Sequence, residues 1–204
     1  MRPLFQQFAH PSGWLGRIAG SVMAKGTEDD RWLVDLLDLQ PDDRVLEVGF
    51  GPGVAIELMS AQTRNGLIAG VDPSAVMVQE AIKRNHGAAQ AARVHLRQGT
   101  VTSLPYPDSS FTKALALHSI YFRPSVEEGL RELHRVLSTG GLLAIGARMR
   151  QPDASRFNPS RYGLTIDHVA DIKSTLKSVG FREVESQQRV LRREAITALL
   201  SRRS

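Results

Sequence analysis

The chain has 204 residues, no cysteine and a formal net charge of +5 at pH 7. The lack of cysteine excludes disulfides, thiolate zinc sites and a cysteine nucleophile. No run approaches the roughly 18 apolar residues that a membrane-spanning helix needs. The length suits one domain. We expect a single cytoplasmic domain over residues 1–204, with a helical arm at 1–40 and a core at 41–204.

From residue 44 onward, short apolar strands alternate with amphipathic helices. The pattern predicts strands at 44–49, 67–72, 94–97, 111–117 and 142–147, and helices at 54–62, 74–84, 125–137 and 166–178. Ser74 is placed to cap its helix, and Val76 and Ile82 are expected to face inward. Gly140 and Gly141 are expected to end one helix and admit the next strand.

The C-terminal third predicts a loop at 151–162 and two β-rich runs at 181–191 and 195–200. Few residues separate these runs, so the last pair is expected to be antiparallel. The whole alternation predicts an α/β fold, Rossmann-like and doubly wound, with a mostly parallel seven-stranded sheet whose last strand is antiparallel. Such sheets bind ligands at the carboxyl ends of their strands, near the first strand.

A glycine-rich turn follows the first strand. Gly49, Gly51 and Gly53 let the backbone turn sharply and let a ligand lie against the main chain. Glycines alone do not select a ligand, because dinucleotide-binding enzymes share them. Glu47 is more selective, since a carboxylate there suits an ammonium group and opposes a pyrophosphate. The third glycine of the dinucleotide pattern is absent, because position 54 is Val.

Asp72 ends the second predicted strand, where a carboxylate can accept both hydroxyls of a ribose. A turn residue before Pro73 is the alternative explanation for this acid. The ribose interaction does not distinguish an NAD ribose from an adenosine ribose.

Four segments together resemble the class I S-adenosylmethionine-dependent methyltransferases, in particular the small-molecule branch of the ubiquinone/menaquinone-biosynthesis type. The segments are VLEVGFGPG at 45–53, GVDPSAVM at 70–77, LPYPDSSF at 104–111 and ELHRVLSTGG at 132–141. The segments have the order and spacing typical of the family, and the resemblance covers about residues 33–147, with a looser similarity to the end.

The resemblance implies S-adenosylmethionine as cofactor, with S-adenosylhomocysteine as product. Glu47 and the three glycines would hold the methionine part, while Asp72 with Pro73 would bind the ribose. Met77 would lie on the adenine, and Thr100 with Val101 would approach its edge. Relatives usually carry an acid at position 100, and a hydroxyl lacks the charge-assisted strength of a carboxylate.

The best catalytic candidates follow the fourth predicted strand. His118 can accept a proton near neutral pH. The alternative is that His118 only forms hydrogen bonds with the backbone groups next to the cofactor. Ser119 and Tyr121 are further candidates, although Tyr121 and Phe122 fit a pocket wall better. Many methyltransferases need no strong base, because alignment of the nucleophile supplies much of the rate.

In this family an aromatic-rich N-terminal segment often covers the substrate as a lid. The arm carries Phe5, Phe8, His10, Trp14 and Met23. Core packing of these side chains is the alternative. The loop at 151–162 is a second candidate lid wall.

The remaining histidines show no metal-ligand spacing, so no metal site is expected. They are His86, His95, His134 and His168.

Three alternatives to a small-molecule methyltransferase stay open. The basic charge is compatible with an RNA or DNA methyltransferase, but residues 118–121 lack the Pro-Pro segment typical of amino-group DNA enzymes. A non-catalytic protein that binds S-adenosylmethionine and an NAD-linked dehydrogenase are the others. Oligomeric state and the methyl acceptor are not readable from the sequence.

Overall fold

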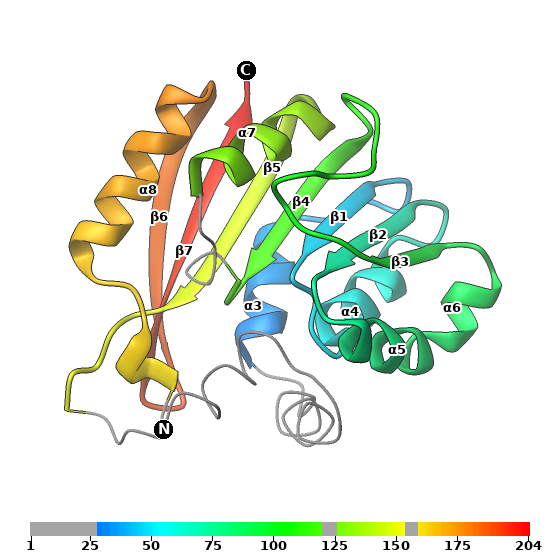
Figure 1. The fold of residues 1–204 in the computed structure, drawn as a ribbon, viewed down its shortest axis with the longest axis horizontal. Helices are drawn as coiled ribbons and strands as arrows, with labels where there is room; N and C mark the ends of the chain where they lie inside the picture. Colours follow the sequence, from blue (N-terminus) through cyan, green and yellow to red (C-terminus); the bar gives the residue numbers. More distant parts are fainter. Residues whose placement is uncertain (1–27, 120–125, 154–158) are drawn as a thin grey trace.

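One seven-stranded mixed sheet organises the molecule, with the strand order β3-β2-β1-β4-β5-β7-β6 (Figure 1). The computed structural model describes residues 28–119, 126–153 and 159–204. The strands are β1 Arg44–Val48, β2 Leu67–Asp72, β3 Val94–Gln98, β4 Phe111–Leu117, β5 Leu137–Arg148, β6 Phe181–Leu191 and β7 Glu194–Arg203. The predicted doubly wound α/β fold is confirmed.

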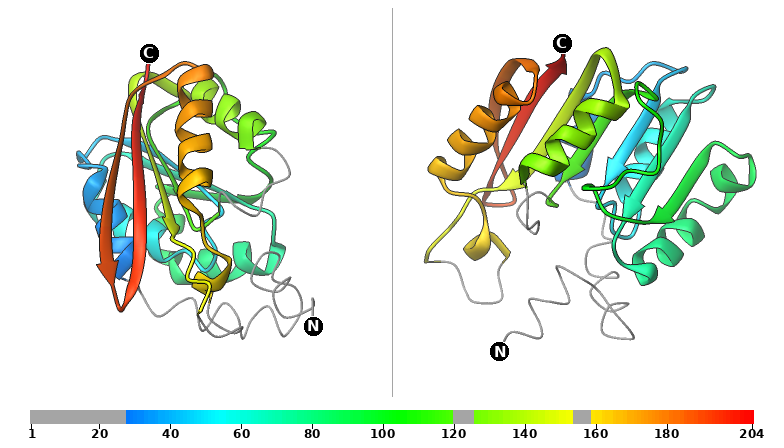
Figure 2. Two further views of the ribbon diagram at one scale, coloured as in Figure 1. Left: turned by 90° about the vertical axis from the view of Figure 1, so that its left-hand side faces the viewer. Right: turned by 45° about the horizontal axis from the view of Figure 1, so that its top comes forward.

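Helices cover both faces of this sheet (Figure 2). The helices are α3 Glu28–Leu36, α4 Val54–Gln62, α5 Ala75–Arg84, α6 His86–Gln90, α7 Val126–Val136 and α8 Ile166–Ser178, with a 3₁₀ turn at Pro159–Tyr162. α3, α4 and α5 pack on one face, and α7 and α8 pack on the other. Because both faces are covered, the inner strands are apolar on both sides, and Val45, Leu46 and Val48 are all fully buried.

The antiparallel end of the sheet agrees with the prediction. β1 to β5 pair in parallel, whereas β7 pairs antiparallel with both β5 and β6. The β6–β7 turn at Arg192 and Arg193 has left-handed backbone at both residues, with φ of 48° and 70°. A tight connection of this kind can only reverse the chain, because a parallel pair needs a crossover of a dozen residues or more.

Two local predictions are wrong. Ile82 is 42% exposed, because the buried face of α5 runs through Met77 and Ala81 instead. Gly140 and Gly141 do not separate α7 from β5, because α7 ends at Val136 and β5 begins at the next residue. The pairing with β4 shifts from Phe111–Leu137 to Lys113–Leu142, so the two glycines lie in an irregular stretch of β5, and regular pairing resumes at Leu142.

Part of the expected N-terminal arm is helix α3, and it is packed into the core. Trp32, Leu33, Val34 and Leu37 are buried, and Gly146 of β5 is needed where Leu33 crosses the sheet. A Cβ at Gly146 would lie 2.8 Å from Cγ of Leu33. The aromatic residues at 5, 8 and 14, with His10 and Met23, lie outside the described residues.

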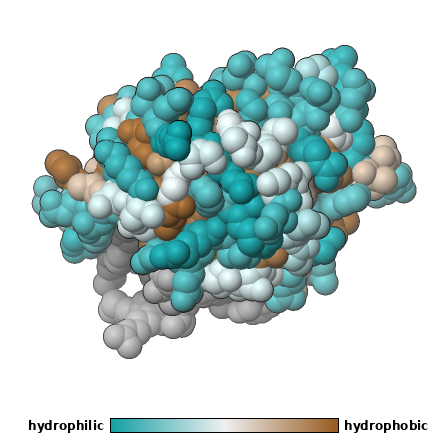
Figure 3. Space-filling view, turned by 90° about the horizontal axis from the view of Figure 1, so that it is seen from above, coloured by the Kyte–Doolittle hydropathy of each residue, from teal (hydrophilic) through white to brown (hydrophobic). Residues whose placement is uncertain are grey.

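The edge where the parallel strands begin shows no continuous apolar surface. In Figure 3, which views the molecule from above, hydrophilic atoms dominate and apolar atoms form small separate groups. No helix among the residues that the structure describes is long and apolar enough to cross a membrane.

Candidate cofactor and catalytic site

The glycine turn after β1 has the backbone that its sequence predicts. Gly49, Gly51 and Gly53 have φ values of 75°, 52° and 79°, all in the left-handed region. The amide of Gly49 donates to the carbonyl of Val71 at 2.8 Å, which ties the turn to the end of β2. The turn therefore lies where β1 and β2 end, as expected for a ligand cradle.

Gly53 has a second reason to be glycine. A Cβ there would lie 2.8 Å from Cβ of Ala81 and 2.8 Å from Nδ2 of Asn85, both at the end of α5. Asn85 also donates from Nδ2 to the carbonyl of Gly53 at 3.1 Å. The third glycine thus permits close packing of α4 on α5, which the sequence pattern did not reveal.

Glu47 presents a buried carboxylate that lacks a donor. Glu47 is only 3% exposed, and its Oε2 has no hydrogen-bond partner among the described residues. Burial raises the pKa of Glu47 well above its usual value, and the negative charges of Asp30 and Asp72 add to this effect. A buried acid with one unsatisfied oxygen is costly unless a cationic donor binds to it. The ammonium group of S-adenosylmethionine fits this requirement.

Asp72 is buried and already organises the backbone around it. Its Oδ2 accepts from the amide of Gly51 at 2.9 Å, and its Oδ1 accepts from the amide of Ser74 at 2.8 Å. A carboxylate oxygen has a second lone pair, so these bonds leave acceptor capacity for a ribose hydroxyl. Pro73 is exposed beside it.

The adenine candidates differ in accessibility. Met77 is 1% exposed, on the first turn of α5, where its amide donates to Oγ of Ser74. Thr100 is exposed, and its hydroxyl lies 3.1 Å from the hydroxyl of Thr102. Val101 is buried against α7, where a Cβ on Gly129 would come within 2.7 Å of it.

The end of β3 lies next to Asp72. The amide of Gly99 donates to the carbonyl of Asp72 at 3.0 Å. The structure therefore brings Thr100 and Asp72 to the same edge of the sheet.

His118 follows β4 directly and has a strained backbone, with φ of 52°. Its amide donates to the carbonyl of Gly146 at 2.7 Å, and Nε2 lies 2.9 Å from Oδ2 of Asp29. Burial lowers the pKa of His118, against the raising effect of the hydrogen bond with Asp29. Strained backbone of this kind concentrates at functional sites.

The residue after His118 links β4 to the glycine turn. Ser119 donates from Oγ to the carbonyl of Val48 at 2.9 Å, at the end of β1. This contact brings the catalytic candidates to the cofactor cradle. Tyr121 and Phe122 lie outside the described residues.

Sequence reasoning missed a charged group beside His118. Asp29 of α3 is 5% exposed, and its Oδ2 also accepts from Arg148 at 3.0 Å. Arg148, the last residue of β5, donates from Nε to Glu194 at 2.8 Å. The acids in the first turn of α3 were visible in the sequence, but no local pattern pairs residue 29 with residue 118.

The described residues contain no group of three histidine, cysteine or acidic side chains that could hold a metal ion. His86, His95 and His168 are exposed, and His168 instead forms a capping box with Thr165 at the start of α8. His134 packs edge-on against Phe181, with ring centroids 5.1 Å apart.

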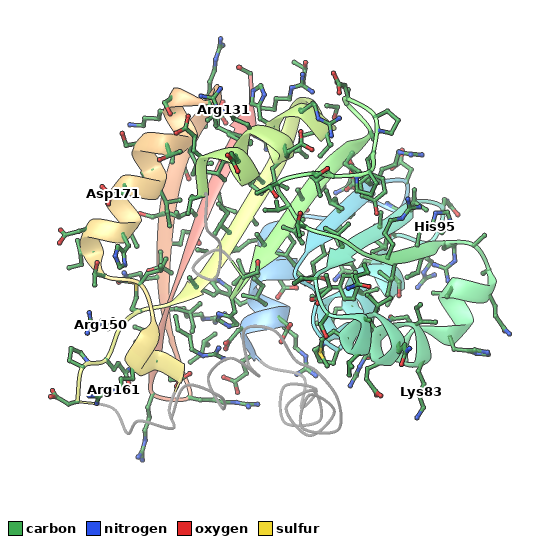
Figure 4. The ribbon with its side chains drawn as sticks, in the orientation of Figure 1. Lys83, His95, Arg131, Arg150, Arg161 and Asp171 are labelled. Carbon is green, nitrogen blue, oxygen red and sulfur yellow. The ribbon has the colours of Figure 1, made fainter. Side chains whose placement is uncertain are left out.

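Charged side chains are spread over the surface, as Figure 4 shows for Lys83 on α5, Arg131 on α7, Arg150 after β5 and Arg161 in the 3₁₀ turn. Several basic residues are also paired with acids, including Arg131 with Glu127. Within the described ranges, these labelled basic side chains therefore come from four different parts of the fold.

Comparison with known proteins agrees with the geometry. Residues 46–145 match the family model described as a methyltransferase domain. A Bacillus subtilis (strain 168) protein, the uncharacterized methyltransferase YdaC, is 29% identical over 171 residues, which are 83% of this chain and 89% of that protein.

Two further similarities concern the ubiquinone/menaquinone-biosynthesis type of methyltransferase and the fold. The ubiquinone/menaquinone biosynthesis C-methyltransferase UbiE of Geotalea daltonii is 29% identical over 119 residues, 56% of this chain and 49% of that enzyme. The crystal structure of a SAM-dependent methyltransferase from Aquifex aeolicus superposes with a TM-score of 0.73 at 17% identity, covering 89% of this chain and 95% of that one. The chain belongs to the class I S-adenosylmethionine-dependent methyltransferases.

Proposed function

We propose that this methyltransferase acts on a small-molecule acceptor and binds its cofactor across the glycine turn, between Glu47 and Asp72. The observation that carries the binding mode is the buried Oε2 of Glu47, which has no hydrogen-bond donor in the part of the chain that the structure describes. When bound, S-adenosylmethionine supplies a methyl group activated by the adjacent positive sulfur. Glu47 would accept a hydrogen bond from the ammonium group, and Asp72 would accept from the ribose hydroxyls.

The remaining residues shape the site. Gly49 and Gly51 keep the backbone of the turn bare, and Met77, Thr100 and Val101 would surround the adenine. His118 and Tyr121 are proposed to face the methyl acceptor. A cytoplasmic location is part of the proposal and rests on the cysteine-free composition, which suits a reducing compartment.

Cofactor binding is tested by calorimetry with S-adenosylmethionine and S-adenosylhomocysteine. Asp72→Asn should weaken both ligands about 10- to 100-fold, because hydrogen bonds to a charged group contribute about 1.5–3 kcal/mol. Glu185→Gln, an exposed acid on β6, is the matched control and should bind like the wild type. Unchanged affinity in Asp72→Asn would remove Asp72 from the ribose role.

The acceptor class is tested by release of S-adenosylhomocysteine with hydroquinone, ethanolamine, benzoate and acetylacetone, and with mixed RNA and DNA. Turnover on a small compound supports the proposal. Labelling of nucleic acid would favour the nucleic-acid alternative, and stoichiometric binding without turnover on any acceptor would favour a non-catalytic protein.

A further inference from the structure

Four charged or titratable side chains form a chain of contacts beside the cofactor cradle. His118 contacts Asp29 at 2.9 Å, Arg148 contacts the same Asp29 oxygen at 3.0 Å, and Arg148 also contacts Glu194 at 2.8 Å. The group joins α3 to the ends of β4 and β5 and to the start of β7. It therefore lies at the edge of the sheet where ligands of this fold bind.

The contacts determine which imidazole nitrogen carries the proton. Burial alone would raise the pKa of Asp29, but the hydrogen bond from His118 and the charge of Arg148 leave it below its ordinary value. Asp29 is therefore an ionised acceptor, so Nε2 of His118 must be the donor in their hydrogen bond. Nδ1 then carries a lone pair, and this buried nitrogen has no hydrogen-bond partner among the described residues.

The carboxylates around the ring favour acceptance of a proton, against burial and the charge of Arg148, which lower the pKa of His118. Asp29 and Glu194 are two carboxylates, and Arg148 supplies one positive charge, so the three groups carry one net negative charge. An imidazolium at His118 would balance that charge. Asp30, on the same turn of α3, adds a further negative charge near the ring. The same logic orients and charges the histidine in hydrolase triads.

We propose that Asp29 is a positioning residue, which holds His118 so that Nδ1 takes the proton of the methyl acceptor. The inference rests on the proposed function and narrows its substrate class to nucleophiles that carry an O–H or N–H bond. The acceptor atom forms a bond to the methyl carbon, the methyl–sulfur bond breaks with its electron pair left on sulfur, and the acceptor's proton moves to Nδ1. The products are the methylated acceptor, S-adenosylhomocysteine and an imidazolium.

The test is nitrogen NMR of protein labelled with ¹⁵N-histidine and saturated with S-adenosylhomocysteine, with His118→Asn to assign the signal. At pH 7 the wild type should show a neutral His118 ring protonated at Nε2. Asp29→Asn should lower the pKa of His118, which a pH titration of the same signals measures, because a neutral amide stabilises the imidazolium less than a carboxylate does. Glu194→Gln, which contacts Arg148 but not the ring, is the matched control and should keep the wild-type signal.

The outcomes separate this inference from the proposed function. Failure of the wild type to bind S-adenosylhomocysteine in calorimetry would contradict the proposed function itself. With binding intact, a wild-type ring protonated at Nδ1, or an Asp29→Asn variant with an unchanged pKa at His118, would overturn the positioning role. The wild-type spectrum decides even if Asp29→Asn does not fold. Methylation of dimethyl sulfide, a nucleophile without a removable proton, would overturn the acceptor class.

Discussion

At the residue scale, Glu47 has opposite consequences for folding and for binding. Burial, followed by the charges of Asp30 and Asp72, raises the pKa of Glu47. An acid whose pKa is raised by folding binds its proton more tightly in the folded state. Its contribution to stability is therefore present below the unfolded value of 4.5 and is lost as pH rises through the folded value. The ammonium group of bound S-adenosylmethionine would offset the stability that is lost when Glu47 is ionised.

Glu47→Gln should therefore stabilise the free protein at pH 8 while weakening the cofactor. We expect a higher Tm without ligand and an affinity for S-adenosylmethionine lower by about 10- to 100-fold, the value of a charge-assisted hydrogen bond. Thermal unfolding and calorimetry on the same samples test both effects. A variant with lower stability and unchanged affinity would mean that Glu47 is structural.

Gly53 should be sensitive to substitution by alanine. Its φ of 79° disfavours a side chain, and the added Cβ would meet Ala81 and Asn85. Gly53→Ala is expected to cost at least about 1–3 kcal/mol in the free energy of unfolding, measured with urea. Gly87→Ala on α6, where an added Cβ meets no atom within 4 Å, is the control and should be neutral or stabilising.

At the element scale, one arginine fastens α7 to the loop between β3 and β4. Arg135 donates to both oxygens of Glu132, to Asp108 and to the carbonyls of Leu104 and Tyr106. Glu132 in turn accepts from the amide of Leu104 at 2.8 Å. The hydrogen bond with Glu132, followed by that with Asp108, raises the pKa of Arg135, so its charge is fixed.

Arg135→Lys should destabilise the protein by about 1–3 kcal/mol, because an ammonium cannot reproduce the fork of a guanidinium. Urea unfolding measures the change. Arg131→Ala, on the same helix, loses only an exposed pair with Glu127 and should cost less than about 0.5 kcal/mol. Equal losses of stability in the two variants would show that the hydrogen bonds of Arg135 do not hold α7 to the loop between β3 and β4.

The helices and strands were largely predictable from the sequence, and the predictions that failed did so for physical reasons. β2, β4, α4 and α8 have the predicted bounds, because each is a clear apolar or amphipathic run between strong breaks. The five residues of α6 went unpredicted, since so short a helix has no measurable periodicity. The irregular stretch of β5 at Gly140 was missed because glycine pairs occur both in turns and in irregular strands.

The site was predictable where its residues follow one another in the chain. Glu47, the glycines and Asp72 lie at strand ends, and parallel pairing brings those ends together. The Asp29–His118 contact joins residues 89 positions apart, and only the packing of α3 on the sheet creates it. The hydrogen bonds that the amides of Gly51 and Ser74 donate to Asp72 could not be predicted from the sequence either, because they depend on how the glycine turn folds.

At the scale of the whole molecule, two half-buried histidines, His118 and His134, should make stability depend on pH. Burial lowers the pKa of His134, and the positive charge of Arg203 adds to this. The pKa of His118 is lowered as well, chiefly by burial. For a histidine with a lowered folded pKa, the stabilisation is present above the unfolded value of 6.5 and is lost as pH falls below it.

The contribution of these two histidines to the free energy of unfolding without ligand should therefore fall between pH 7 and pH 5, whereas the raised pKa of Glu47 acts in the opposite direction. Urea unfolding across this range is the measurement. His134→Gln should show a smaller decrease than the wild type, because it removes one of the two groups that must take up a proton. An identical decrease in the variant would assign the pH dependence elsewhere.

Cofactor binding should couple to the stability of the whole molecule in the same pH direction as the two histidines. If Glu47 holds a proton in the free protein and gives it up to accept the ammonium, binding becomes more favourable as pH rises. A ligand that binds only the folded state raises stability by RT ln(1 + [L]/Kd), so the Tm increase at fixed S-adenosylhomocysteine should grow from pH 5 to pH 8. In Glu47→Gln, which has no proton to release at this position, the increase should be smaller and nearly independent of pH. A wild-type increase that is constant with pH would show that Glu47 does not change protonation on binding, and the ammonium group would then have to be held by other residues.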